Sequence, residues 1–271
     1  MDNMINLIKT FSGFFLVLAL ISWKADKSGP WVTTKGNRIT LHTRPLNHSK
    51  TPSPDSLVIK QIISEQEEVI DYVNQKLKTN FNGPVEIFLY NYDEAKEKIG
   101  TNGGGFASMN GRQLFFTFYA QPVFNTLRNR EEYVGVHEMV HIVTLNTLGN
   151  ITTSFFGEGY ANALDGNYGS RIENNRMFRQ RNDSTVARMK LRGRLLTPSE
   201  LLYNDSIPPR AFYPQIGCLV SWLFDTYGVE KINKLYSVKR KKIEKQFPEV
   251  TGERFAEMER RYMEYQATNS H

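Results

Sequence analysis

The stretch from Glu131 to Leu148, EEYVGVHEMVHIVTLNTL, decides the fold of this chain. Its apolar residues recur with helical spacing, it contains no proline, and Gly149-Asn150 follows as a stop signal. The sequence therefore predicts a mostly buried helix over this range. His137 and His141 are four residues apart and share one face of that helix. Histidines on a buried face are costly unless a metal ion or hydrogen-bond partners satisfy them.

The five residues from His137 to His141 read HEMVH. Two imidazoles at this spacing can bind one Zn²⁺, and Glu138 lies beside them, where its carboxylate can hold the metal-bound water and take its proton. The alternative is a pair of core histidines bonded to the backbone, with an exposed glutamate. The whole chain holds only 5 histidines, so we favour the zinc site.

A catalytic zinc site needs a third protein ligand and an open fourth position. Glu158 follows His141 by 17 residues, within the sequence FFGEGYAN at residues 155–162. The chain from Gly149 to Phe155 is long enough to turn between two helices, so a second helix starting near Phe156 would return Glu158 to the histidine pair. Alternatively, Glu158 is a first-turn carboxylate that only stabilises the helix dipole.

The pair of motifs HEMVH and GEGYA resembles the gluzincin zinc metallopeptidases, and in particular the small bacterial proteins called peptidase MA-like. The resemblance is strongest over about residues 106–166. It is weaker over Tyr213 to Gly228 and over Phe247 to Tyr265.

This resemblance implies His137, His141 and Glu158 as zinc ligands and Glu138 as the general base. Many gluzincins carry an aspartate four residues after the ligand glutamate, where it supports a zinc-bound histidine. This chain has Asn162 at that position, which can accept a histidine N–H but adds no charge.

The family also implies a thermolysin-like layout, in which the strand before the metal helix binds substrate backbone by strand addition. Gln113 to Tyr119 occupies that place, although it could equally be an ordinary half-buried strand. A tyrosine at the start of the helix from Tyr213 to Tyr227 would donate to the oxyanion. Tyr213 is the candidate, with a packing role as the alternative, and Tyr203 and Tyr236 come next.

The remaining pattern indicates an α+β fold: a small mixed sheet in the N-terminal half, followed by a mostly helical half. After Tyr119 we expect only helices. The earlier elements are predicted as strands at residues 31–34, 38–44 and 84–90, a strand entered through residues 103–106, a long helix at 56–77 and a short one at 92–99.

The first 24 residues are interpreted as a signal peptide or signal anchor, and residues 30–271 as the metallopeptidase domain. Lys9 precedes an apolar stretch from Phe11 to Trp23, which is shorter than the roughly 20 residues of a relaxed membrane span. Its cleavage signal is poor, so N-terminal membrane anchoring is an alternative to cleavage. Either way we expect export, with the domain periplasmic, extracellular or anchored outside the cytoplasm. Cys218 is the single cysteine, which excludes an intramolecular disulfide.

The net charge of +6 is modest, and much of it comes from the stretch Arg171 to Arg194. This stretch lacks interleaved aromatic residues, so it favours a solvated face or a mobile flap over a polyanion site, and no nucleic-acid partner is expected. The sequence as a whole predicts a zinc-dependent metallopeptidase acting on a peptide or protein substrate. The alternatives are a zinc hydrolase of a non-peptide amide, or a non-catalytic binding or assembly protein that retains the fold.

Overall fold

The structure is a computed structural model that describes residues 29–44, 53–91, 94–95, 104–108, 110–118, 122–173 and 176–268. The predicted export segment, residues 1–24, lies outside these ranges. Within them, no helix combines the length and the apolar character that a membrane span requires. The α+β class predicted from the sequence is confirmed.

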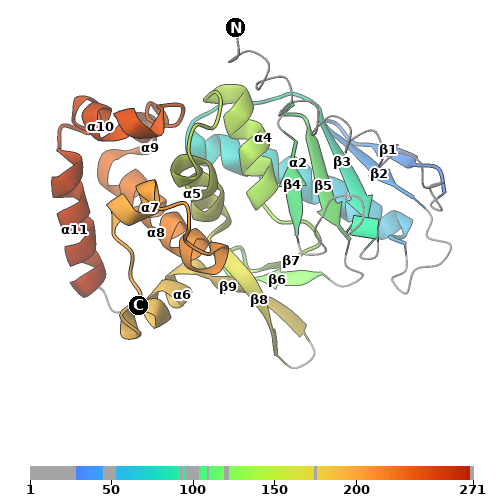
Figure 1. Ribbon diagram of the computed structural model, residues 1–271. Helices are drawn as coiled ribbons and strands as arrows, with labels where there is room; N and C mark the ends of the chain where they lie inside the picture. The colour runs from blue at the N-terminus through green and yellow to red at the C-terminus, as the bar shows by residue number, and fades with distance from the viewer. Residues whose placement is uncertain are drawn as a thin grey trace, which may run out of the picture.

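A five-stranded mixed sheet forms one side of the molecule (Figure 1). Its strand order is β1-β2-β3-β5-β4, in which β2, β3 and β5 are parallel and the two outer strands are antiparallel to their neighbours. The strands span Val32–Lys35 (β1), Ile39–Thr43 (β2), Val85–Tyr90 (β3), Gly105–Ala107 (β4) and Gln113–Thr117 (β5). These bounds agree with the predicted strands to within one or two residues. Tyr119 and most of the predicted helix at 92–99 lie outside the described residues.

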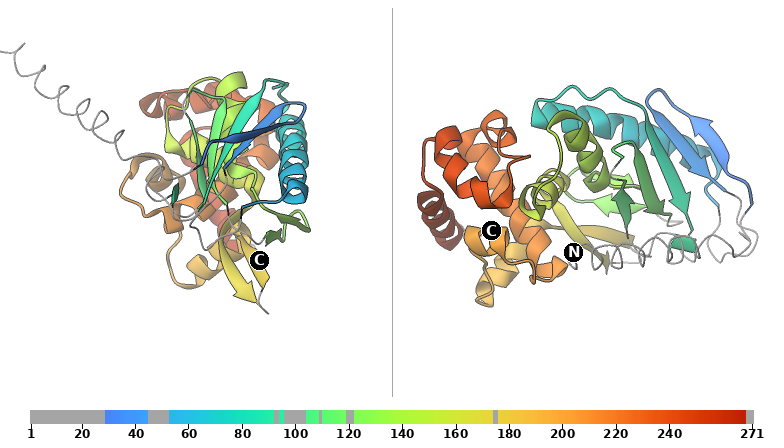
Figure 2. Two further views of the ribbon diagram at one scale, coloured as in Figure 1. Left: turned by 90° about the vertical axis from the view of Figure 1, so that its right-hand side faces the viewer. Right: turned by 45° about the horizontal axis from the view of Figure 1, so that its top comes forward.

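Helix α2 (Ser56–Leu77) covers one face of this sheet, and it has the bounds that the sequence predicts (Figure 2). Asp55 caps the helix, because its side chain accepts hydrogen bonds from the backbone N–H groups of Leu57 and Val58, both at 2.9 Å. Buried residues then recur at helical spacing and pack against the alternating buried positions of β3. The apolar residues buried on α2 are Ile62, Val69, Ile70, Val73 and Leu77.

A second, four-stranded sheet corrects the expectation that the chain is purely helical after Tyr119. Its order is β7-β6-β9-β8, and its strands are Val123–Asn125 (β6), Arg130–Glu132 (β7), Asn167–Glu173 (β8) and Arg176–Arg181 (β9). The basic stretch from Arg171 to Arg194 thus forms the end of β8, all of β9 and all of helix α6 (Asn182–Leu191).

Helix α4 (His137–Thr147) begins six residues later than predicted, because Glu131 and Glu132 belong to β7. The Glu132 side chain is 2% exposed, accepts a hydrogen bond from Asn125 Nδ2 at 2.9 Å and pairs with Arg128 at 2.7 Å. These tertiary contacts hold the segment in the sheet despite its helical pattern, since such contacts override local propensity.

The helical half of the molecule lies beyond α4 and α5 (Ser154–Asp165), which stand between the sheet and the other helices (Figure 1). α5 packs closely on α8 (Pro209–Tyr227): a Cβ atom at Gly159 would lie only 2.6 Å from Cγ2 of Val220. The remaining helices are α7 (Pro198–Tyr203), α9 (Val229–Asn233), α10 (Ile243–Thr251) and α11 (Phe255–Thr268).

The predicted start of α8 at Tyr213 is wrong, because the helix begins at Pro209 and places Tyr213 in its second turn. Pro208 is the N-cap residue and Pro209 the first helical residue. Proline fits this position because its fixed φ suits a helix and the first turn needs no N–H donor.

Two side chains of α2 fix the approach to α4. Gln66 Nε2 donates to the carbonyl oxygen of Val134 at 3.1 Å, and the Glu65 carboxylate accepts from the backbone N–H of Tyr133 at 3.2 Å. Glu65 is 3% exposed. Burial raises the pKa of its carboxyl group from 4.5 to about 7, although hydrogen bonds from Gln61 and Tyr133 oppose the shift.

We predict that E65Q changes the pH dependence of stability in a defined direction. The folded protein holds the Glu65 proton more tightly than the unfolded chain does, so the wild type loses stability as pH rises from about 4.5 to about 7. The loss is on the order of 3 kcal/mol for a shift of this size. Relative to wild type, the unfolding free energy of E65Q should therefore rise over this range and then level off. Urea denaturation of both metal-free proteins at several pH values measures this difference.

Glu67 provides a matched control on the same helix. Burial alone would raise the pKa of Glu67, but donors from Arg38 and the Ile39 N–H lower it overall. Its stabilising contribution is present above the unfolded pKa and is lost as pH falls. E67Q should therefore be most destabilised near neutral pH. A stability difference for E65Q that stays flat with pH would contradict the assignment.

Candidate metal centre and its pocket

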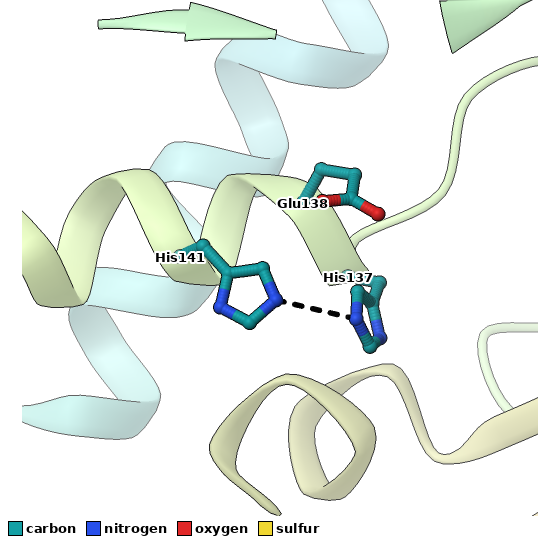
Figure 3. Close-up of side chains that lie close together, drawn as sticks. All are labelled: His137, Glu138 and His141. Carbon is teal, nitrogen blue, oxygen red and sulfur yellow. Dashed lines mark hydrogen bonds between the residues drawn. The ribbon is translucent and has the colours of Figure 1, made fainter. Parts of the chain in front are cut away.

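The first two turns of α4 present His137 and His141 on one side of the helix (Figure 3). Their Nε2 atoms face each other at 3.3 Å, and their rings meet edge to face with centroids 5.0 Å apart. The other side of α4 is fully buried through Met139, Val140 and residues of the next turn. That burial fixes the helix rotation, so both imidazoles must face the pocket.

Helix α5 brings Glu158 to the histidine pair, as the spacing of the sequence predicts. The chain turns after α4, and Thr153 caps α5 by accepting a hydrogen bond from the Phe156 N–H at 3.3 Å. Glu158 then follows in the second turn. Its Oε2 lies 3.2 Å from His137 Nε2, and its Oε1 lies 3.7 Å from His141 Nε2.

These separations fit a zinc ion. Ligands placed tetrahedrally at about 2.0–2.1 Å from zinc lie roughly 3.3–3.4 Å from one another. The three distances between His137, His141 and Glu158 are 3.3, 3.2 and 3.7 Å. Oε2 of Glu158 is buried without a hydrogen-bond partner, so its contact with His137 is close but poorly aligned. Three side chains whose N and O atoms converge in this way are suited to bind a metal ion.

Glu138 stands at the edge of this triangle. Candidate ligand atoms of His137, Glu138 and His141 lie within 4.8 Å of one another, a looser grouping than the one that Glu158 makes. In Figure 3 the Glu138 side chain leaves α4 on a different side from the two imidazoles. The backbone N–H of Ala107 donates to its carboxylate. This position suits a general base better than a ligand, as the sequence interpretation has it.

Burial and mutual charge set the protonation of the metal-free site. Burial and the His137 charge lower the pKa of His141 to about 4. Burial opposes protonation of His137, but its contacts with Glu158 and Glu138 raise its pKa, while the same histidine holds the pKa of Glu158 below its usual value. Burial and Glu158 raise the pKa of Glu138. In the metal-free site, His137 and Glu158 therefore each favour the charged form of the other, whereas His141 is a neutral imidazole near pH 7.

Asn162 does not support a histidine in this structure. Its Nδ2 donates instead to the backbone carbonyl of Glu158 at 2.8 Å, and the buried Nδ1 of His141 has no hydrogen-bond partner among the described residues. The outer nitrogen of a metal-binding histidine usually donates to a carboxylate, a carbonyl or water.

Tyr213 lines the pocket beside the metal centre. Its ring centroid lies 6.2 Å from that of His137, and its hydroxyl makes no hydrogen bond within the described part of the chain. Burial, with a contribution from Glu158, raises its pKa to about 12, so the hydroxyl keeps its proton. Tyr203 and Tyr236 do not line this pocket: Tyr203 is 44% exposed, and Tyr236 donates to Thr144 Oγ1 inside the core.

A pocket of about 740 Å³ opens over the metal centre. Its walls come from α4, α5, α8, the edge strand β4 and both strands of the pair β8–β9. Tyr168, Asp165 and Arg179 line it, and the sequence analysis did not identify them as site residues. One signal was available for Asp165: it follows Glu158 by seven residues, which is two helical turns and the same face. No local pattern pointed to Arg179 or Tyr168.

The edge strand beside the site is β4, not the strand predicted from Gln113 to Tyr119. β5 pairs with β3 on one side and with β4 on the other, so both of its edges are occupied. The Ser108 N–H donates to the Gln113 carbonyl, and the Gly104 carbonyl accepts from the Thr117 N–H. Because these groups alternate along an antiparallel strand, the N–H and C=O groups of Gly105 and Ala107 point away from β5. Ala107 N–H reaches Glu138, and Gly105 lines the pocket.

The chain matches no protein-family model and no curated protein. Its likeness to gluzincins therefore rests on the motifs in the sequence and on the geometry of the three converging side chains.

We predict that the purified protein binds about one zinc ion per chain. H137A and H141A each remove one of three ligands, and each should lose most of the metal. The measurement is elemental analysis by mass spectrometry after dialysis against a weak chelator. H42Q is the matched control: His42 lies on β2, stacked on Phe88, and its replacement should leave the zinc content unchanged. Full zinc occupancy in the H137A/H141A double variant would place the site elsewhere.

Proposed function

We propose that this protein is a zinc-dependent metallopeptidase that hydrolyses peptide bonds in an exported location. The observation that carries the proposal is the convergence of His137, His141 and Glu158 at tetrahedral spacing, with Glu138 beside them and an open pocket above. When bound there, zinc supplies Lewis-acid chemistry: it polarises a carbonyl group and lowers the pKa of a water molecule toward about 7. The export component rests on the sequence of residues 1–24 alone.

The protein's own groups divide the remaining work. Glu138 accepts the proton of the attacking water on its carboxylate and then passes it to the leaving amine. The N–H of Ala107 orients that carboxylate. Tyr213 donates its hydroxyl hydrogen to the oxygen that becomes negatively charged, and its raised pKa keeps this hydrogen in place.

The free edge of β4 suits an extended peptide. Gly105 turns its N–H and C=O away from β5 and toward the pocket, so a substrate backbone can add to the sheet as a further strand. A Cβ at Gly105 would lie 2.4 Å from the Phe116 ring and 2.6 Å from the Phe115 carbonyl oxygen. The close cross-strand packing therefore requires glycine at this position.

Two other functions compete with this one: hydrolysis of a non-peptide amide at the same site, and a non-catalytic binding or assembly role. The outward-facing edge of β4 favours a peptide backbone over a small amide. A proton acceptor that is held by Ala107 N–H beside the metal ligands favours hydrolysis over simple binding.

We predict that E138Q keeps its zinc and loses peptide cleavage. Glutamine has the same size and polarity but cannot accept the proton, and general-base catalysis of this kind is worth about 100- to 10,000-fold. Mass spectrometry of a peptide library incubated with wild type and E138Q measures the loss, and elemental analysis confirms that the metal is retained. Turnover by E138Q within threefold of wild type would exclude the role of Glu138. Zinc-loaded wild type that cleaves simple acyl amides but no peptide would favour the non-peptide alternative.

We predict that Y213F lowers kcat more than it changes KM. The charge on the oxyanion develops only in the transition state, and loss of one donor there costs about 2.7–4 kcal/mol, or roughly 100- to 1000-fold. Y168F is the matched control, because Tyr168 lines the same pocket with its ring against Tyr213 at 5.6 Å. Steady-state kinetics should leave Y168F close to wild type. A wild-type kcat in zinc-loaded Y213F would leave Tyr213 with a packing role only.

A further inference from the structure

The far end of the pocket carries a cationic group that the proposed chemistry does not use. Arg179 on β9 is the one lysine or arginine among the described residues that line the pocket, and its side chain is 23% exposed. Its Nη2 donates to Oδ2 of Asp165 at 2.6 Å, and Asp165 is 1% exposed. A buried carboxylate therefore fixes the guanidinium at the pocket wall.

The backbone of Gly135 leaves room for this guanidinium. A Cβ atom at Gly135 would lie 2.4 Å from Nη1 of Arg179, so any other residue there would displace the arginine. Gly135 precedes His137 by two residues, which ties the position of Arg179 to the start of α4. The arginine is thus held from two sides, by α5 through Asp165 and by the approach to α4.

The donors of Arg179 are only partly used. A guanidinium carries five N–H groups in a planar fork, and the described residues accept from one nitrogen of Arg179, through Asp165. The other buried acid nearby, Glu132, is close enough for the charge of Arg179 to lower its pKa, but its hydrogen bond comes from Asn125 and its ion pairs from Arg128 and Arg130. The remaining acids of the pocket, Glu138 and Glu158, belong to the metal centre. The free donors of Arg179 therefore suit a ligand carboxylate, which matches the fork in shape and charge.

The spacing of residues along α5 sets the distance between the Arg179 guanidinium and the scissile peptide bond at the proposed metal centre. Glu158 and Asp165 are seven residues apart on one face of the helix, which corresponds to about 10 Å along its axis. An extended peptide covers that distance in about three residues. A carboxylate on Arg179 would thus lie two or three residues from the scissile bond.

From this geometry we propose that Arg179 is a specificity residue that binds a carboxylate of the peptide substrate, two or three residues from the cleaved bond. The inference rests on the proposed peptidase function. The carboxylate has two possible sources with the same chemistry: the C-terminus of the peptide or an acidic side chain. A C-terminal source makes the enzyme release short C-terminal fragments, whereas an acidic side chain makes it an endopeptidase with an acidic preference.

The test measures binding to zinc-loaded E138Q, so that it does not depend on turnover. Isothermal titration calorimetry compares two pairs of peptides. The members of the first pair have one sequence and end in a free carboxylate or in an amide. The members of the second pair are both amidated and carry Glu or Gln three residues from the end. A charge-assisted hydrogen bond of this kind should give the carboxylate form roughly 10- to 100-fold tighter binding in one of the two pairs. The pair that shows the difference identifies the source.

The variants separate specificity from structure. R179M in the E138Q background should abolish the preference for the carboxylate form and leave the affinity of the neutral form within about threefold. R181M is the matched control, since Arg181 lies on the same strand with its side chain 48% exposed and paired with Asp183. It should keep the preference. If R179M weakens charged and neutral peptides equally, Arg179 is structural and the proposal is wrong.

Two further outcomes distinguish this proposal from the proposed function. If R179M does not fold, the measurement on E138Q alone still tests the proposal. Equal affinity of E138Q for the charged and the neutral peptide in both pairs overturns the proposal. If wild type cleaves peptides with no such preference, the peptidase function stands and the role of Arg179 fails. If E138Q shows an Arg179-dependent preference while wild type cleaves no peptide, the binding role stands and the peptidase function fails.

Discussion

The convergence of His137 Nε2, His141 Nε2 and the Glu158 carboxylate is a constraint that the packing of α4 and α5 has to satisfy. Three lone-pair donors within 3.2–3.7 Å of one another repel unless a proton or a cation lies among them. Their helices must therefore be fixed to within about half an ångström for a metal ion to fit. Close contacts elsewhere in the fold hold each of the two helices that carry them, and the ion pair between His137 and Glu158 adds to these contacts.

On one side, α2 fixes the chain that enters α4 through hydrogen bonds to the backbone of Tyr133 and Val134. On the other side, α8 fixes α5, because Gly159 lets the two helix backbones approach until Val220 fills the space of a missing side chain. Glu158 is the neighbour of Gly159, so the same contact that packs α5 also sets the depth of the ligand carboxylate. A change in side-chain volume where α5 packs on α8 would therefore also move the carboxylate of Glu158 at the pocket wall.

The sequence predicted those features of the fold and the site that arise from local patterns. The amphipathic spacing of residues 56–77 predicted the observed bounds of α2, and the four-residue spacing of His137 and His141 predicted their shared face. The return of Glu158 also followed from short-range information, because only the six residues 148–153 separate α4 from α5. The identity of these residues as metal ligands stays a prediction.

The features that the sequence did not predict depend on contacts between distant segments. The sequence around Glu132 has a helical pattern, yet the buried contacts of Glu132 with Asn125 and Arg128 hold it in strand β7. The position of β4 at the sheet edge follows from strand pairing, which periodicity does not encode. Arg179 comes from a basic stretch interpreted as a solvated face or flap, and only the buried Asp165 turns it toward the pocket. Composition alone cannot distinguish a paired, inward-facing arginine from a solvated one.

The metal-free protonation of the site explains how the ligands can stay assembled before a metal binds. His137 has a raised pKa and Glu158 a lowered one, so an ion pair bridges α4 and α5 in the absence of metal, while His141 with a pKa of about 4 is already neutral. This differs from small structural zinc sites, in which the metal supplies the folding energy. Here the large apolar core and the ion pair hold α4 against α5, so the side chains of the proposed metal site already point toward one another without a metal.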